Sequence, residues 1–424
     1  MKKIIKLLTT LIPLIIAISC TSCGNKKGEP YTRKNLDYFF ALDETNHDLS
    51  KSVDKGLTTE WCSTKAGQLG VKSYRIWVDI DILFQVDSND NITVNQNYKA
   101  ELQHFVDKLK ENGVERFSAF GWSLMHVKED KNMYGWAVPS PYDEFDKYSR
   151  FLKVQAKAYG LLAKEFPDIE YFEPMNEPDQ ESGAFLALNG YQYGADSTVN
   201  EDFLLTTDEI VHVMGDICYN VRKEVKANNP NAKVLLPALT NYSDNYIFLD
   251  KFYNAIESKT LPNGSNVAVT DPDEYFDILN WHPYNFGGSG VYDGWVDEQN
   301  LIHDVAVKHG DAEKPVWFTE IGYFDNNENG NYLYPDDYQK QIGEGWVETL
   351  DTIKNELPYV ETVFFFRLTN MYTQDAGSSE NTFGLFYNPD DPVNKGNPKP
   401  AAISIFHYIN GENADDSILY NLEA

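Results

Sequence analysis

The sequence predicts a single (β/α)8 barrel, on the basis of two observations. Short runs of β-branched and aromatic residues alternate eight times with longer segments that have the period of an amphipathic helix. No linker, low-complexity block or strong internal repeat divides the 424 residues into further domains. Strict alternation of strand and helix favours a closed parallel barrel over an open sheet, and a chain of this length fits such a barrel when its loops are long.

The predicted elements follow one another in regular order. The eight strands are 36–42, 71–78, 114–120, 169–173, 233–236, 276–281, 315–319 and 360–366. Helical periodicity is clearest in 98–111, 148–165, 208–227, 338–356 and, after the last strand, 401–409. Long loops follow the strands at 79–97, 121–147, 179–207, 283–300, 324–337 and 368–398. In a barrel these loops gather at the carboxyl-terminal face, where active sites are built.

The charge balance argues against a nucleic-acid partner. The 65 Asp and Glu outnumber the 36 Lys and Arg, so the formal net charge is −29, and such an acidic surface repels polyanions. The 27 Tyr, 24 Phe and 8 Trp suit a protein that stacks against sugars, but a large aromatic core would give the same counts. Composition therefore leaves both explanations open.

The first 23 residues have the pattern of a signal peptide. Three lysines precede an apolar run, 7–18, that is too short to span a bilayer, and small residues then lead to Cys20 and Cys23. This ending resembles the lipobox of bacterial lipoproteins, in which a cysteine is lipidated and becomes the mature amino terminus. Either cysteine fits the pattern, and an ordinary cleaved secretory signal is the alternative.

Three parts of the chain are therefore expected, a lipoprotein signal peptide over 1–23, a tether over 24–34 and the barrel domain over 35–424. The mature protein would be an extracytoplasmic monomer, lipid-anchored to a bacterial membrane at the cell surface or on its periplasmic side. The remaining cysteines, Cys62 and Cys218, lie in predicted helices, and we expect buried free thiols rather than a disulfide.

Two glutamates end predicted strands on opposite sides of the barrel. Glu177 follows the fourth strand in the run Glu-Pro-Met-Asn-Glu-Pro, and Glu320 ends the seventh strand in the run Trp-Phe-Thr-Glu-Ile-Gly-Tyr. Strand ends converge on one mouth, so the two side chains can approach each other. Cleavage of a glycosidic bond needs such a pair, one carboxyl that protonates the leaving oxygen and one that attacks or activates water.

This constellation resembles the clan A glycoside hydrolases, retaining (β/α)8 enzymes with an Asn-Glu pair at the fourth strand and a Glu at the seventh. The resemblance implies that Glu177 is the acid/base, that Glu320 is the nucleophile and that Asn176 binds the sugar 2-hydroxyl. It covers the barrel at the level of strand order. No single family within the clan is matched closely enough to transfer a substrate.

Further residues match the same clan. Arg75 on the second strand is similar to the arginine beside the nucleophile, and His282 and Tyr284 are similar to the His-x-Tyr after the sixth strand, with Tyr284 donating to Glu320. A structural ion pair for Arg75 and a packed core position for His282 are the alternatives. One departure is the run 364–366, three phenylalanines where many members carry a tryptophan that floors the catalytic subsite.

Tryptophans near strand ends are the candidates for stacking on sugar rings. They are Trp77, Trp122, Trp136, Trp281 and Trp295, and core packing is the alternative for each. Trp136 and Trp295 stand in polar, glycine-containing surroundings and are the preferred candidates. All five are expected to line a cleft at the mouth.

One loop has part of the spacing of a calcium site. In 325–336, oxygen-bearing residues and a glycine at the sixth place fit such a loop, but a strand precedes it and Asp replaces the usual bidentate Glu. An Asn-Gly-rich turn is the preferred interpretation. No zinc spacing or phosphate-binding glycine loop occurs, so no metal and no cofactor are expected.

The sequence thus predicts a retaining glycoside hydrolase that cleaves β-glycosidic bonds by double displacement. Endo-action on a β-glucan, xylan or mannan is favoured, and an exo-acting β-glycosidase is the close alternative. A transglycosylase would use the same residues. A non-catalytic glycan-binding lipoprotein on the same barrel is the rival from another class.

Overall fold

The fold is a parallel barrel, as expected. The computed structural model describes residues 28–44, 57–121, 136–180, 186–190, 201–240, 245–258, 269–285, 289–325, 336–371 and 379–420. In these residues eight parallel strands form one sheet in the order β10-β11-β12-β1-β2-β5-β7-β9. Parallel bridges between Leu235 and Ile278 and between Leu239 and Trp281 join the segments of the two outer strands. The curled sheet is consistent with the (β/α)8 fold.

Each predicted strand has a counterpart, and the last one has the predicted limits. The strands are β1 (Phe40–Glu44), β2 (Ser73–Trp77), β5 (Arg116–Phe120), β7 (Ile169–Phe172), β9 (Lys233–Val234), β10 (Leu279–Asn280), β11 (Val316–Ile321) and β12 (Val360–Phe366). β9 and β10 are only two residues long, because isolated bridges replace continuous pairing where the sheet closes.

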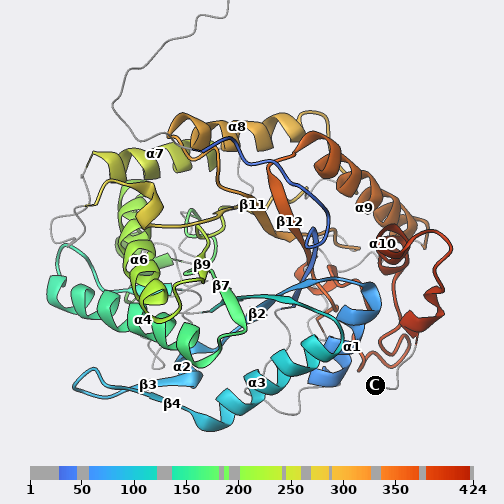
Figure 1. Ribbon diagram of the computed structural model, residues 1–424, viewed down its shortest axis with the longest axis horizontal. Helices are drawn as coiled ribbons and strands as arrows, with labels where there is room; N and C mark the ends of the chain where they lie inside the picture. The colour runs from blue at the N-terminus through green and yellow to red at the C-terminus, as the bar shows by residue number, and fades with distance from the viewer. Residues whose placement is uncertain are drawn as a thin grey trace, which may run out of the picture.

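Helices surround the strands, as Figure 1 shows. They are α1 (Thr59–Leu69), α2 (Ile80–Leu83), α3 (Gln96–Glu111), α4 (Phe145–Glu165), α6 (Thr207–Asn228), α7 (Asn245–Glu257), α8 (Trp295–Lys308), α9 (Asp336–Glu356) and α10 (Pro400–Asn410). Short 3-10 helices occur at Glu201–Phe203, Pro272–Glu274, Ser379–Thr382 and Asp416–Tyr420. Local signals set several ends. Thr206 and Glu209 form a capping box at α6, and Gly70 ends α1 in the left-handed conformation.

Three predicted loops contain strands of their own. The segment 79–97 folds into α2 and the antiparallel hairpin of β3 (Phe84–Val86) and β4 (Ile92–Val94). The loops 121–147 and 179–207 supply β6 (Trp136–Val138) and β8 (Leu186–Leu188), which pair in parallel. Each strand is three residues long, too short for its alternation to stand out in the sequence.

Side-chain alternation divides the strands between two environments. Ala41, Trp317 and Phe364 point into the barrel and form a small apolar cluster with Leu235 and Ile278. Two residues further along β1 and β2, the same inward face carries Asp43 and Arg75. The barrel is therefore filled by apolar side chains at its centre and by a charged layer towards the carboxyl-terminal end.

The segment before β1 packs against the amino-terminal end of the barrel. The Tyr31 hydroxyl donates to Glu361 at 2.9 Å, and the Tyr31 amide donates to the carbonyl of Ala312 at 2.8 Å. The Arg33 guanidinium donates to main-chain carbonyls at the end of α9, with 2.6 Å to that of Lys354. These residues lie at the opposite end of the strands from Glu320.

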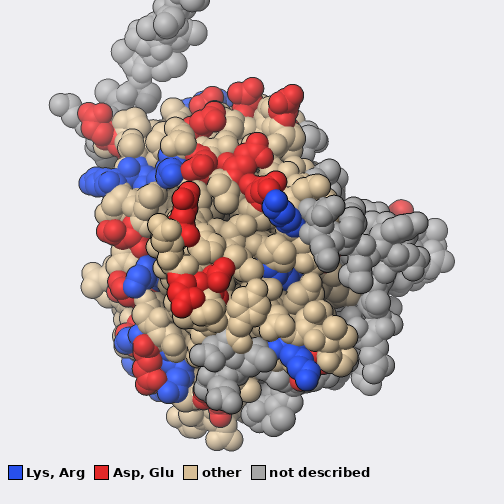
Figure 2. Space-filling model, turned by 90° about the vertical axis from the view of Figure 1, so that its right-hand side faces the viewer, with Lys and Arg blue, Asp and Glu red and all other residues tan. Residues whose placement is uncertain are grey.

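Buried thiols and an acidic surface agree with the composition. Cys62 and Cys218 are buried and free. Among the described helices, none has the length and hydropathy needed to cross a membrane. The face in Figure 2 carries scattered Asp and Glu interspersed with Lys and Arg, and its coloured residues form no continuous basic surface.

The loop that carries Glu177 is fixed to the neighbouring strand end. The Asp179 carboxylate accepts hydrogen bonds from the main-chain amide of Thr240 at 3.0 Å and from its hydroxyl at 2.8 Å. The Glu177 amide donates to the carbonyl of Ala238 at 2.9 Å. Burial raises the pKa of Asp179 to about 7, although the bonds from Thr240 oppose the shift.

Asp179→Asn should make the stability less dependent on pH. Folding raises the pKa of Asp179 from 3.8 to about 7, so its contribution to stability is complete below the lower value and is lost as the pH rises through the higher one. The amide cannot ionise, so the wild type should lose stability relative to the variant between about pH 4 and about pH 8. Chemical denaturation of both proteins over this range measures the difference. Parallel stability curves would contradict the assignment.

Candidate active site

Six predicted site residues meet at the carboxyl-terminal end of the barrel. Arg75 lies on β2, Asn176 and Glu177 follow β7, His282 and Tyr284 follow β10, and Glu320 lies on β11. Hydrogen bonds link Arg75, Asn176, Tyr284 and Glu320 to one another and Glu177 to His282, and a contact of 3.6 Å between His282 and Glu320 joins the two groups. The topology thus brings together residues that are 245 positions apart in the chain, as for Arg75 and Glu320.

A buried arginine is the centre of this network. Arg75 is fully buried, and its guanidinium lies 3.5 Å above the ring of Phe120. Its donors reach Glu173 (Nε to Oε2, 2.9 Å), Asp43 (Nη1 to Oδ2, 3.2 Å), Glu320 (Nη1 to Oε1, 2.5 Å) and Asn176 (Nη2 to Oδ1, 3.0 Å). One cation therefore orients three carboxyl groups and the amide that precedes Glu177.

Glu320 is held as a carboxylate. Its Oε1 accepts from Arg75, and its Oε2 accepts from the Tyr284 hydroxyl at 2.9 Å. Burial alone would raise the pKa of Glu320, but the charges of His282 and Arg75, together with the bonds from Arg75 and Tyr284, lower it below its ordinary value. An ionised, oriented carboxylate is the form that a nucleophile needs.

Glu177 lies opposite and has different partners. Its Oε1 is 2.7 Å from Nδ1 of His282, and its Oε2 accepts from Nε2 of Gln180 at 2.7 Å. Its backbone has a φ of 40°, in the left-handed region that side chains other than glycine seldom adopt. This turn, with the amide bonded to Ala238, directs the side chain towards His282.

The hydrogen bonds of His282 restrict its protonation state. The Thr319 hydroxyl donates to Oδ1 of Asn280 at 2.9 Å, so at 3.0 Å it accepts from Nε2 of His282. Nε2 therefore carries a proton, and a further proton is shared between Nδ1 and Glu177. Burial lowers the pKa of His282, but the charge of Glu320 and the bond to Glu177 raise it above its ordinary value.

The two glutamates are close together. One oxygen of Glu177, one of Glu320 and a ring nitrogen of His282 all lie within 4.8 Å of one another. In glycosidases, two carboxyl groups about 5 to 5.5 Å apart are typical of enzymes that retain the anomeric configuration. A separation of about 6.5 to 9.5 Å is typical of inverting enzymes, because it leaves space for the attacking water. Each of the four carboxylate oxygens already receives a hydrogen bond or faces His282, an arrangement that needs no metal ion.

Two predicted stacking residues belong to the core. Trp281 is fully buried, and its indole nitrogen donates to Gln299 at 2.8 Å. Trp295 is 1% exposed and donates to the carbonyl of Pro283. The predictions for Trp281 and Trp295 are therefore wrong. Because neighbouring strand residues face opposite sides, His282 takes the inward position and Trp281 points towards the helices.

The other tryptophans have different outcomes. Trp77 shares the inward face of β2 with Arg75 and is partly exposed, with its nitrogen 3.0 Å from Oδ1 of Asp79. It stays a candidate for substrate contact. Trp122 lies outside the described residues, and so does the side chain of Trp136, whose backbone opens β6.

Aromatic side chains stand where many clan members have a tryptophan. Phe366, at the end of β12, packs edge to face on Tyr284 with ring centroids 6.0 Å apart. Phe383 contacts both rings, and Phe324 packs against Phe383. The side of the site next to Tyr284 is thus lined by phenylalanines.

Sequence reasoning missed three residues of the network. Asp43 bonds Arg75, Thr319 bonds His282, and Asn280 orients Thr319. Asp43 and Thr319 occupy inward positions of their strands near the carboxyl end, a signal available from strand alternation. Glu173, four residues before Glu177, also supports the network, because it accepts hydrogen bonds from Arg75 and from the Ala238 amide.

The loop 325–336, whose spacing only partly fits a calcium site, lies almost entirely outside the described residues. Its first member, Asp325, is buried and pairs with Lys399, whose nitrogen is 2.8 Å from Oδ2. Gln339 donates to the same oxygen at 3.0 Å. Asp325 thus already has a cationic partner and a hydrogen-bond donor from the protein.

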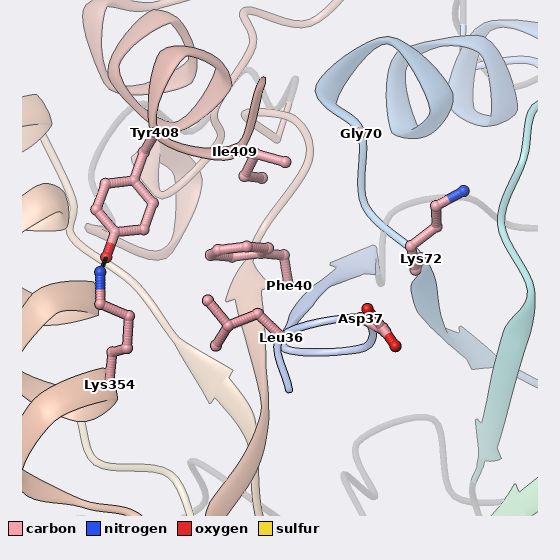
Figure 3. A pocket seen from close by; sticks show the side chains of 8 residues that line it. All are labelled: Leu36, Asp37, Phe40, Gly70, Lys72, Lys354, Tyr408 and Ile409. Carbon is pink, nitrogen blue, oxygen red and sulfur yellow. Dashed lines mark hydrogen bonds between the residues drawn. The ribbon is translucent and has the colours of Figure 1, made fainter. Parts of the chain in front are cut away.

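A separate cavity opens at the other end of the barrel. It has a volume of about 420 Å³, and Figure 3 shows Leu36, Phe40, Tyr408 and Ile409 around it, with Lys354 bonded to the Tyr408 hydroxyl at 3.0 Å. Its lining residues precede β1 and β2 or end α9 and α10. The cavity is therefore remote from Glu177 and Glu320.

Comparison with known proteins agrees with this geometry. Residues 219–388 match a family model described as a glycosyl hydrolase catalytic core, a range that contains His282, Tyr284 and Glu320. A search of curated proteins finds no match.

Solved structures with the same fold are glycosidases. A β-glucosidase from Thermotoga maritima in complex with galacto-hydroximolactam superposes with a TM-score of 0.60 at 13% identity, over 91% of this chain and 100% of its own. A family 39 glycoside hydrolase from Bacteroides cellulosilyticus WH2 superposes with a TM-score of 0.50 at 14% identity, over 88% and 64%. The chain thus shares the fold of these glycosidases, and residues 219–388 resemble a glycosyl hydrolase catalytic core.

Proposed function

We propose that the protein is a retaining glycosidase that cleaves β-glycosidic bonds by double displacement. The observation that carries the proposal is the approach of Glu177 and Glu320, with an oxygen of each within 4.8 Å of the other. Glu320 is the nucleophile, because Arg75 and Tyr284 keep it ionised and oriented. Glu177 is the acid/base, because it shares a proton with His282.

In the first step a Glu320 oxygen attacks the anomeric carbon, and the bond to the leaving oxygen breaks. Glu177 supplies the proton that the leaving oxygen gains. In the second step Glu177 accepts a proton from water, and the water oxygen replaces Glu320 at the same carbon. Nδ1 of His282 is 2.7 Å from Oε1 of Glu177 and 3.6 Å from Oε2 of Glu320. When the intermediate forms, Glu320 loses its negative charge. The proton that His282 and Glu177 share is then attracted less strongly to Nδ1 of His282.

The substrate is a β-linked polysaccharide or oligosaccharide. Long loops follow the strands at the catalytic end, which supports endo-action on a β-glucan, xylan or mannan. The β-glucosidase from Thermotoga maritima is similar in fold and supports the exo-acting alternative. A non-catalytic glycan-binding protein is disfavoured, because binding alone does not require the paired glutamates with their arginine, tyrosine and histidine.

Substitution of either glutamate should abolish or strongly reduce hydrolysis. Glu320→Ala removes the nucleophile, and Glu177→Ala removes the acid/base, whose effect is about 10²- to 10⁴-fold. Product release from a panel of β-glucans, xylans, mannans and galactans measures the loss, and azide should restore turnover of an activated substrate by Glu177→Ala. Glu170→Ala, at an exposed position of β7, is the matched control. Full activity in both variants would refute the assignment.

The stereochemical outcome tests the mechanism separately. If Glu320 forms a covalent intermediate, the first product released should have the β-configuration of the substrate, because two displacements restore the centre. Proton NMR of the early products distinguishes the anomers before mutarotation. An α-anomer formed first would require a water between the carboxyls and would exclude double displacement.

We also propose that the protein is a lipoprotein anchored through Cys20 or Cys23, both of which lie outside the described residues. The contacts of Tyr31 and Arg33 support this proposal, because they hold the last residues of the expected tether at the amino-terminal end of the barrel. The mouth with Glu320 is at the opposite end. A tethered enzyme would thus present its active site away from the membrane to an external glycan.

The anchor predicts a difference between two cysteine variants. Substitution of the lipidated residue, by Cys20→Ser or by Cys23→Ser, should abolish labelling by a fatty-acid analogue and move the protein from the membrane fraction. The other variant should behave like the wild type and serves as the control. If neither variant loses labelling and the leader is still cleaved, the result would favour an ordinary secretory signal.

A further inference from the structure

Asp43 is a buried carboxyl inside the network around Arg75. It lies on β1 beside Arg75 of β2 and Phe366 of β12 in the strand register, and its side chain is inaccessible to solvent. Its Oδ2 accepts from Nη1 of Arg75 at 3.2 Å. Within the described part of the chain, its Oδ1 is buried and has no hydrogen-bond partner.

Arg75 cannot neutralise all the carboxyl groups that surround it. The same Nη1 serves Asp43 and Glu320, while Nε serves Glu173. If all three carboxyls were ionised, one fixed cation would face three anions in a nearly dry region. Such an excess of buried charge is relieved most easily when one carboxyl retains its proton.

The hydrogen bonds indicate which carboxyl that is. Glu320 has donors on both oxygens, from Arg75 and Tyr284. Glu173 also has two, from Arg75 and from the main-chain amide of Ala238 at 3.3 Å. Asp43 has one donor, at the longest of the three distances to Arg75. A carboxylic acid with its proton on Oδ1 fits this site better than a carboxylate does.

The surrounding charges agree with a retained proton. Burial raises the pKa of Asp43 well above its ordinary value, and Glu320 and Glu44 add to the shift, while Arg75 and His282 oppose it. Burial raises the pKa of Glu173 as well, but that carboxyl has the better hydrogen bonds. The titratable and charged groups that face Asp43 or flank it lie on six strands or just after them, and are Glu44, Arg75, Glu173, His282, Glu320 and Arg367.

We propose that Asp43 is a neutral carboxylic acid in the resting enzyme and that it positions Arg75. The positive charge of the guanidinium then stabilises only the carboxylates of Glu320 and Glu173. This inference rests on the proposed role of Glu320 as the nucleophile. An ionised Asp43 would share the positive charge and weaken the stabilisation of the Glu320 carboxylate. The neutral form holds the same nitrogen by a hydrogen bond without that competition.

Infrared spectroscopy tests the protonation state without any assay of activity. In protein labelled with ¹³C at the aspartate carboxyls, a protonated side chain gives a carbonyl band that shifts with the label and is separate from carboxylate bands. At about pH 8, above the pKa of Asp179 of about 7, the band should be present in the wild type and in Asp179→Asn. It should be absent from Asp43→Asn. A wild type without the band would overturn the proposal, even if Asp43→Asn failed to fold.

Kinetics tests the positioning role. Asp43→Asn mimics the neutral acid, so its kcat/KM should stay within about threefold of the wild type, and the acidic limb of its pH profile should move by less than about half a unit. Asp43→Ala removes the acceptor for Nη1 and should lower kcat more than about tenfold. Glu173→Gln, which removes a charged partner, should shift the acidic limb.

A shift of the acidic limb in Asp43→Asn as large as that in Glu173→Gln would show that Asp43 is ionised, and would overturn the proposal. An infrared band without glycosidase activity in the wild type would refute the proposed function and leave the protonation state of Asp43 established. The two failures are therefore distinguishable.

Discussion

The active site depends on one buried guanidinium. Arg75 bonds the end of β1, the segment after β7 and Glu320 of β11, so a single side chain sets the relative positions of groups from three parts of the barrel. Removal of one partner of a buried ion pair typically costs about 3 to 5 kcal/mol, because the remaining charge is left unpaired. The aromatic face of Phe120 supports the guanidinium from below and restricts its plane. The chemistry and the stability of this end of the barrel are therefore linked.

Proton placement follows from the same arrangement. The Thr319 hydroxyl donates to Asn280, so it can only accept from Nε2 of His282, which therefore carries a proton. The other exchangeable proton lies between Nδ1 of His282 and Glu177. Glu320, by contrast, accepts a hydrogen bond on each oxygen, from Arg75 and from Tyr284, and the charges of His282 and Arg75 lower its pKa. The neighbours of Glu177 and Glu320 therefore give these two chemically identical side chains different roles, as proton donor and as ionised carboxylate.

The sequence predicted those elements that have a repeating residue pattern. It predicted less well the features that depend on a single tertiary contact. Strand 360–366 was predicted with its observed limits, because six of its seven residues are valine, threonine or phenylalanine and an arginine follows them. β9 and β10 shrink to two residues, because closure of the sheet there depends on isolated bridges between distant segments. The glutamates were predicted from their places at strand ends, whereas Arg75 and Tyr284 were predicted from the resemblance to the clan A enzymes. Trp295 was misjudged, since a polar sequence context does not reveal that the first turn of α8 packs inward.

The backbone conformation of Glu177 has a cost in stability. A residue with a side chain at φ 40° is destabilised by roughly 1 kcal/mol or more relative to glycine, which adopts this region freely. The catalytic role proposed for Glu177 accounts for a glutamate at this position in spite of that cost. Glycine there would relieve the backbone but would remove the carboxyl group. The left-handed turn therefore marks a position at which stability and the proposed chemistry make opposite demands on the residue.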